Sequence, residues 1–142
     1  MKRACVTAAD LVRAARALVG VRFQLHGRSP ASGLDCVGVI GATLAACGLV
    51  ARWPNGYALR RLQMPDADAV LCPLGLAPVA PTCACGTIVL LKTALCQYHF
   101  AILTGQDQSA VHAHAGLRRV VEAPLPPAWP RLRHWRLAAP ST

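Results

Sequence analysis

Helical and strand-like patterns occupy different parts of this 142-residue chain. Apolar residues recur at helical spacing before residue 48, and short apolar segments bounded by turn residues follow residue 86. Helices that precede a run of strands are typical of an α+β domain, in which the helices cover one face of the sheet. We therefore predict N-terminal helices packed on one face of a small antiparallel sheet of about five strands, all in one domain over residues 1–142.

Two helices are expected in the first third of the chain. The first covers residues 8–19, opens on a capping box and stops at Gly20. The second begins at Asp35 or Cys36 and ends at Cys47. It is apolar nearly all round, which predicts a buried helix.

The remaining segments are shorter. Residues 21–35 and 51–86 are interrupted by glycine and proline and have no sustained period. We expect loops there, with one short helix near residues 66–74. The expected strands are residues 87–91, 98–103, 110–115, 119–122 and 133–137.

Arginine dominates the formal net charge of the chain, which is +9 at pH 7. A basic surface can bind nucleic acid, but these arginines are scattered and no aromatic residues alternate with them as a stacking platform. We therefore expect no direct contact with nucleic acid. No apolar run approaches the roughly 18 to 20 residues that cross a bilayer, so we expect no membrane span.

The N-terminal region lacks the pattern of a secretion signal. Asp10, Arg13 and Arg16 interrupt what would have to be its apolar stretch. We therefore expect the protein to be made in the cytoplasm. The seven cysteines are an odd number, and reduced thiols are the default for a protein without a signal.

Cys36 is the strongest candidate for a nucleophile. It lies in the first turn of the second helix, where backbone amides and the helix dipole stabilise an anion and are expected to lower the pKa of a thiol. Asp35 is a good N-cap for that helix, and Gly38 and Gly41 leave one helix face open to a close neighbour. The alternative is a buried structural cysteine, the interpretation that we favour for Cys47.

Histidines flank a polar turn in one expected hairpin. If the hairpin is centred between residues 105 and 106, His99 lies directly opposite His112. One imidazole then orients the other, so that Cys36, His99 and His112 supply a nucleophile, a base and an orienting group. His114 lies on the same face two residues later and is the alternative third member.

Zinc is the main alternative chemistry. Cys83, Cys85, Cys96 and His99 would form a Cys₃His set suited to tetrahedral Zn²⁺, although a Cys-x-Cys arm is less usual than Cys-x₂-Cys. A zinc site and a catalytic triad both require His99 and exclude each other. We predict the triad, with no metal and no cofactor.

The residues around Cys36 resemble a known family. The segment 21–38, which ends in Gly-Leu-Asp-Cys-Val-Gly, is similar to the nucleophile region of NlpC-type cysteine peptidases, with their Asp-Cys-small-Gly motif at a helix start. The segments 99–102 and 111–113 resemble the family's base strand and the strand that carries its third polar residue. The resemblance extends over about residues 8–137.

This resemblance implies a papain-like NlpC-type fold and hydrolysis of peptide bonds in peptidoglycan stem peptides. It places the nucleophile, the base and the third polar residue at Cys36, His99 and His112, and a helix cap at Asp35. The residues expected at a possible substrate cleft are His26, Arg28 and His114. The sequence departs from the family at 24–28, where bacterial members have Tyr and Trp, and this leaves substrate recognition open.

A finer resemblance is to peptidases encoded in the tail modules of bacteriophages and gene transfer agents. It rests on the Gly-Arg-Ser-Pro approach, on residues 119–122, and on Trp129 with Trp135-Arg136 near the end. It implies a tail-tip component that helps to breach the target cell wall during DNA delivery, with tail hub or baseplate proteins as partners. Such a protein is made in the cytoplasm, carried in the particle tail and active at the periplasmic cell wall. The alternatives are an inactive plug or adaptor of the tail tip and a cytoplasmic murein-peptide hydrolase.

Overall fold

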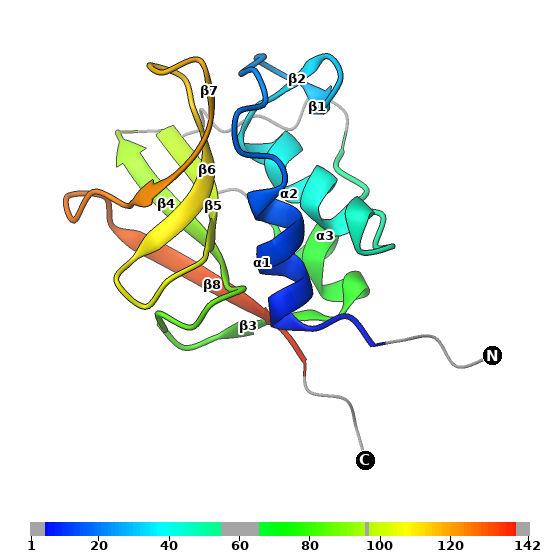
Figure 1. Ribbon diagram of the computed structural model, residues 1–142. Helices are drawn as coiled ribbons and strands as arrows, with labels where there is room; N and C mark the ends of the chain where they lie inside the picture. Colours follow the sequence, from blue (N-terminus) through cyan, green and yellow to red (C-terminus); the bar gives the residue numbers. More distant parts are fainter. Residues whose placement is uncertain (1–4, 55–65, 96, 139–142) are drawn as a thin grey trace.

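Helices and strands form two layers in the computed structural model, which describes residues 5–54, 66–95 and 97–138. Figure 1 shows α1 (Ala8–Arg16) and α2 (Cys36–Ala46) on one side of a curved antiparallel sheet. The predicted α+β fold, with N-terminal helices on one sheet face, is confirmed. No helix within these described ranges has both the length and the hydropathy to cross a membrane.

Helix α1 opens on the predicted capping box. The Thr7 hydroxyl accepts the backbone N–H of Asp10 at 3.2 Å, and the Asp10 carboxylate accepts the N–H of Thr7 at 2.9 Å. The helix ends three residues earlier than expected, because the chain tightens after Arg16. Leu18 donates to the carbonyl of Ala15, three residues back, at 3.0 Å.

Helix α2 has the predicted start and burial. Asp35 is its N-cap, and the helix ends at Ala46, one residue before the predicted end. Gly48 follows with a positive φ of 81°, a conformation that glycine adopts without strain. The apolar composition on all sides places Val37, Val39 and other residues of α2 in the protein interior.

The predicted short helix near residues 66–74 is present as two pieces. These are α3 (Asp68–Leu71) and the 3₁₀ helix η1 (Cys72–Leu74). Asp68 ties this region to the sheet, because its carboxylate accepts the Trp135 indole N–H at 2.7 Å and an Arg133 guanidinium N–H at 2.9 Å.

Within the described ranges, the main sheet has six strands, one more than expected. They are β3 (Leu76–Val79), β4 (Ile88–Ala94), β5 (Gln97–Leu103), β6 (Ser109–His114), β7 (Arg119–Pro124) and β8 (Arg131–Leu137). Their order is β3-β8-β4-β5-β6-β7, with all neighbours antiparallel. The predicted loop at residues 21–35 also contains a two-stranded sheet of β1 (Arg28–Ser29) and β2 (Gly33–Leu34).

Strand β3 is the additional strand, and it lies in a region that we predicted to be irregular. Pro78, which cannot donate to a ladder, obscures the strand pattern. The structure accommodates this proline because β3 is an edge strand paired only with β8.

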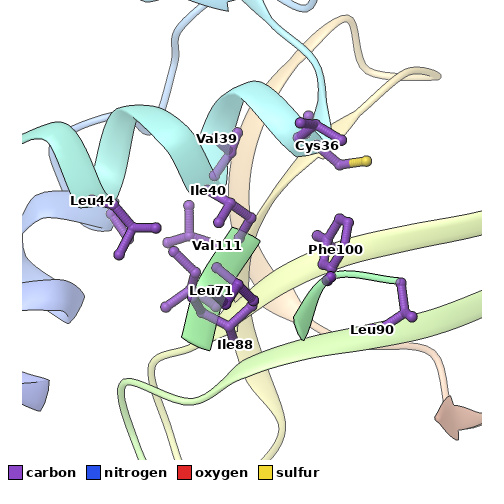
Figure 2. Packing of buried hydrophobic residues seen from close by; sticks show 14 of the residues in the cluster. Cys36, Val39, Ile40, Leu44, Leu71, Ile88, Leu90, Phe100 and Val111 are labelled. Atoms are coloured by element: carbon purple, nitrogen blue, oxygen red, sulfur yellow. The ribbon is translucent and has the colours of Figure 1, made fainter. Parts of the chain in front are cut away.

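Each face of the sheet carries an apolar core. The larger core lies between the sheet and the helices, where Ile40 and Leu44 of α2 pack with Phe100 and Val111 of the sheet (Figure 2). The smaller core lies on the other face and contains Val89, Leu91, Ala101, Leu103, Ala110 and Leu125. Successive residues of β5 alternate between the two cores, as expected for a strand buried on both faces.

Candidate active site

Asp35 fixes the start of α2 and the loop that leads to it. Its carboxylate accepts the backbone N–H of Gly38 at 2.8 Å, which is the predicted helix cap. It also accepts the backbone N–H of His26 at 3.0 Å and pairs with the Arg28 guanidinium at 2.6 Å. Arg28, predicted as a cleft residue, is therefore an ion-pair partner of the helix cap.

The approach loop touches α2 at a crossing of two glycines. A Cβ atom on Gly38 would overlap the carbonyl oxygen of Gly27, so no other residue fits at this position without displacement. This contact holds the loop against the first turn of α2. Cys36, the first residue of the helix, is consequently enclosed by the loop on one side and by the sheet on the other.

The Cys36 thiol is buried, and the backbone N–H of Phe100 in β5 is directed at its sulfur. Figure 2 shows the side chain at the end of α2 nearest Phe100. Burial raises the pKa of the Cys36 thiol to about 12; the Phe100 N–H opposes this rise, whereas the charge of Asp35 adds to it. Our prediction that the helix start lowers this pKa is therefore wrong for the enclosed thiol, because lost hydration outweighs the helix N-terminus.

His99 and His112 form a hydrogen-bonded pair. Nε2 of His99 lies 2.9 Å from Nδ1 of His112, and the ring planes are at 87° to each other. Because only one of the two nitrogens can donate, two arrangements of the proton satisfy this bond. If His99 carries its proton on Nε2, His112 accepts and Nδ1 of His99 is left as a free base.

The predicted hairpin register is wrong by one residue at its centre. The observed pairs Ile102↔Val111 and Leu103↔Ala110 place the centre between residues 106 and 107, not between 105 and 106. The cause lies in the turn, where the Asp107 side chain accepts the N–H of Ser109. In the observed register His112 is diagonal to His99 and not directly opposite.

Burial keeps both imidazoles neutral. Burial, together with the proximity of His112 and His114, lowers the pKa of His99 to about 3. The pKa of His112 falls to about 4 through burial and then through His114. At neutral pH the Cys36 thiol and the imidazoles of His99 and His112 are therefore uncharged.

One pocket of about 720 Å³ is lined by Cys36, His99 and His112 together. Strands β5 and β6 pair at only two positions, and the residues beyond that paired section, 97–99 and 112–115, form one side of the pocket. Cys36 and the loop residues Phe23 and Leu25 form another side. Tyr98 and Phe100, the neighbours of His99, face the helices, so His99 itself points to the other face of the sheet. It still lines the same pocket as Cys36, because β5 and β6 are not paired at this end.

Two solved structures are similar to this chain. One is a variant of the resuscitation promoting factor interacting protein RipA, with a TM-score of 0.61, 17% identity, and coverage of 92% of this chain and 61% of RipA. The other is NlpC1 from Trichomonas vaginalis, with a TM-score of 0.61, 13% identity, and coverage of 96% of this chain and 46% of NlpC1. Both are NlpC/P60 family proteins.

The fold is NlpC-type. The chain spans 61% and 46% of the two neighbours' lengths. No family model and no curated protein matches the sequence. At such low identities the likeness establishes the NlpC-type fold alone.

The other predicted residues lie at the margins of this site. His26 and His114 both line the pocket, and the His114 ring centroid is 6.0 Å from that of His112. His114 also accepts the backbone N–H of Leu117 through Nδ1 at 3.0 Å, which holds it in a turn beyond the His99–His112 pair.

Cys83 and Cys85, two of the predicted zinc ligands, make other contacts in the structure. The Cys85 thiol donates to the carbonyl of Thr104 at 3.2 Å, and the Cys83 thiol contacts the Gln108 side chain. Cys96 lies outside the described residues. The described part of the chain contains no group of three His, Cys, Asp or Glu side chains that could hold a metal ion.

Trp129 is a pocket residue to which we assigned no role from the sequence. Its ring packs against His99 and His112, with centroid distances of 5.7 and 6.1 Å. The only sequence signal was its place in the finer family resemblance. A lone aromatic residue in a proline-rich connection gives no indication of which strand it will cross.

Proposed function

We propose that this chain is a cysteine peptidase that cleaves peptidoglycan stem peptides, with Cys36 as nucleophile, His99 as base and His112 as the group that orients the base. The observation that carries the proposal is the shared pocket, which is lined both by Cys36 and by a His99 that is already hydrogen-bonded to His112. The NlpC-type fold supports the same assignment.

The protonation states suggest the order of the steps. Because thiol and imidazole are both neutral, the thiol proton passes to Nδ1 of His99 as the sulfur attacks the peptide carbonyl carbon. The imidazolium then gives its proton to the leaving amine as the C–N bond breaks. A water activated by neutral His99 releases the acyl group and restores the thiol. The backbone N–H of Cys36, at the helix start, is a donor for the oxyanion.

The setting that we propose is the tail tip of a phage-like particle or gene transfer agent. The support is the sequence resemblance of the approach loop and of the C-terminal segment to tail-module peptidases. In this setting the chain binds tail hub or baseplate proteins and acts at the periplasmic cell wall of the target cell. Mass spectrometry of purified particles tests this proposal, because the chain must co-purify with tails.

A second candidate is a catalytically inactive plug or adaptor of the tail tip. The observation that favours it is the Cys36 thiol, whose pKa is raised to about 12. A thiol so fully protonated is a weak nucleophile until a substrate changes its surroundings. The two candidates therefore differ in whether the thiol is needed for any step.

Digestion of purified peptidoglycan separates the two candidates. Wild-type chain, Cys36→Ala and a matched control, Cys72→Ala at an exposed cysteine, are incubated with sacculi, and released muropeptides are identified by mass spectrometry. An enzyme releases cut stem peptides with wild type and with Cys72→Ala but not with Cys36→Ala. Equal products from wild type and Cys36→Ala, or DNA delivery unchanged by Cys36→Ala, would contradict the proposal that Cys36 is a catalytic nucleophile.

A further inference from the structure

The connection between β7 and β8 crosses the sheet on the face away from the helices. Strands β4, β5 and β6 separate β7 from β8 in the strand order. Residues 125–130 make the crossing, and Leu125 is buried in the smaller core (Figure 1, orange to red). Three of these six residues are prolines, at 126, 127 and 130. Proline stiffens the backbone and supplies no N–H donor, so the connection needs donors from elsewhere.

Arg131 supplies those donors. Its guanidinium donates to the carbonyls of Pro126 at 2.8 Å and Trp129 at 2.5 Å, and more weakly to that of Leu125. It also donates to the side chain of Gln108, in the turn between β5 and β6, at 3.3 Å. A guanidinium carries five N–H donors in a fixed fork, which suits several carbonyls of one tight loop. The connection is thereby fastened to the hairpin that carries the two histidines.

The fastened loop places Trp129 directly on the histidine pair. The indole meets His99 at 67° and His112 at 86°, so it packs edge-on against both rings. Trp129 is partly buried against the smaller core and lines the pocket that contains Cys36. It therefore closes the side of the pair that the strands and the helix leave uncovered.

We propose that Trp129 is a positioning residue for the base: held by Arg131, its indole covers the His99–His112 hydrogen bond, fixes the planes of both rings and excludes water from that hydrogen bond. The catalytic meaning of this cover rests on the proposed function, whereas the packing of the indole on the imidazoles does not. A covered pair keeps its hydrogen bond, because neither of the two bonded nitrogens can exchange its partner for water.

The state of the two rings agrees with such a cover. Loss of hydration disfavours a charged imidazole, and burial is the largest cause of the lowered pKa of both His99 and His112. The other titratable groups that line the pocket are His26, Asp35, Cys36, Tyr98 and His114. Among these, only His114 adds to the lowering of both values.

An NMR titration of the histidine ring protons tests the proposal in the full chain. The variants are Trp129→Ala, Trp129→Phe and Arg131→Met, and single His→Gln variants assign the signals. In the wild type, neither His99 nor His112 should titrate above pH 5. In Trp129→Ala both midpoints should rise by at least one pH unit, and in Trp129→Phe they should stay within a few tenths of the wild type. Arg131→Met should move them in the same direction as Trp129→Ala, because it releases the loop.

His134 is the internal control for the Trp129 variants, because it is buried in β8 but does not line the pocket. Unmoved midpoints of His99 and His112 in Trp129→Ala overturn the proposal, and so do wild-type midpoints near 6.5. If Trp129→Ala does not fold, Arg131→Met provides the test. Unchanged titration midpoints of His99 and His112 in that variant would overturn the proposal that Arg131 holds Trp129 on the two rings.

Hydrolysis by the same variants separates this proposal from the proposed function. If the titration midpoints of His99 and His112 shift in Trp129→Ala but the wild type does not hydrolyse peptidoglycan, the role of Trp129 is supported and the proposed peptidase function is contradicted. If the wild type hydrolyses peptidoglycan but the midpoints do not shift in Trp129→Ala, the peptidase function is supported and the role of Trp129 is contradicted. If both hold, Trp129→Ala should lower kcat far more than it raises KM and should move the acidic limb of the pH profile upward.

Discussion

His99 and His112 share a 2.9 Å hydrogen bond although they are diagonal, not opposite, in their hairpin. Diagonal positions on one sheet face are about 7–8 Å apart, a distance that two imidazoles can bridge. The steep ring angle of 87° follows from this geometry, because Nε2 of one ring must reach Nδ1 of the other. The bond uses Nε2 of His99, so it leaves Nδ1 of this pocket-lining residue outside the pair.

Loss of His112, the proposed orienting ring, should reduce the proposed hydrolysis without abolishing binding. In His112→Ala we expect kcat to fall by about 10- to 100-fold and KM to change little, because His99 keeps its place but loses its fixed tautomer. His99→Ala, which removes the proposed base, should lower kcat by about 10²- to 10⁴-fold. Stem-peptide cleavage followed by chromatography measures both variants.

His114→Gln is the matched control for that pair of variants, because His114 lies on the same strand outside the hydrogen bond. Its activity should stay within a few-fold of the wild type. A larger loss in His114→Gln than in His112→Ala would transfer the orienting role to His114.

The histidine pair should make the fold sensitive to mild acid. The pKa of each ring is lowered in the folded state, to about 3 and about 4, from about 6.5 when unfolded. The unfolded chain therefore binds more protons below pH 6.5, and stability is full above that pH and is lost as the pH falls toward 4. Between pH 7 and pH 5 the free energy of unfolding should drop by up to about 2 kcal/mol for each histidine.

Urea unfolding at pH 7, 6 and 5 measures this loss. The range stops at pH 5 because carboxylates with lowered pKa values, such as Asp10 and Glu122, contribute below it. The double variant His99→Gln/His112→Gln should show a clearly flatter dependence on pH. A wild type that is equally stable at pH 7 and pH 5 would contradict a buried neutral pair.

Local patterns in the sequence predicted much of the site. The capping box, the Asp35 cap and the apolar second helix each depend on residues within one helical turn, and each was confirmed. The histidine hairpin was predicted with the wrong register but the right face. Moving the centre by one residue moves the partner by two, and two residues return a strand to the same face. His112 therefore stays on the same sheet face as His99 in either register, and the two side chains can still contact each other.

Features that depend on distant parts of the chain were not predictable. The pKa of Cys36 has the opposite direction to our prediction because the loop and the sheet bury the thiol, and neither is visible from the helix start alone. Strand β3 was missed because an edge position, which only the strand order reveals, tolerates its proline. The place of Trp129 depends on a connection that passes three strands before it rejoins the sheet.

The charges beside Cys36 should change the reactivity of its thiol in opposite directions. The Asp35 carboxylate raises the pKa of the Cys36 thiol, and the Arg28 guanidinium lowers it. Asp35→Asn should therefore speed alkylation of Cys36 by iodoacetamide at pH 8, and Arg28→Met should slow it. Peptide mass mapping gives the rate for each cysteine, and exposed Cys72 should react equally in all variants. The reverse order of rates would mean that the two charges act on the loop and not on the thiol.

Two glycines of α2 should respond oppositely to the same substitution. In Gly38→Ala the new methyl group overlaps the Gly27 carbonyl, a backbone atom that cannot move without displacing the approach loop. We expect a loss of at least about 2 kcal/mol in the free energy of unfolding, within the range for overpacked sites. In Gly41→Ala the nearest atom is the Trp53 indole nitrogen at 3.5 Å, an ordinary contact. Alanine there should stabilise the helix by up to about 1 kcal/mol.

Urea unfolding at pH 7 measures both glycine variants, and Cys36 alkylation reports the effect on the site. Gly38→Ala should expose the thiol and speed its alkylation, because the loop that encloses Cys36 is the part that must give way. Gly41→Ala should leave that rate unchanged, since its methyl group would meet only the Trp53 indole nitrogen, at 3.5 Å, and not the Gly27 carbonyl. Equal stability of the two variants would show that the loop is not held against the helix at Gly38, and the enclosure that raises the pKa of Cys36 would then need another cause.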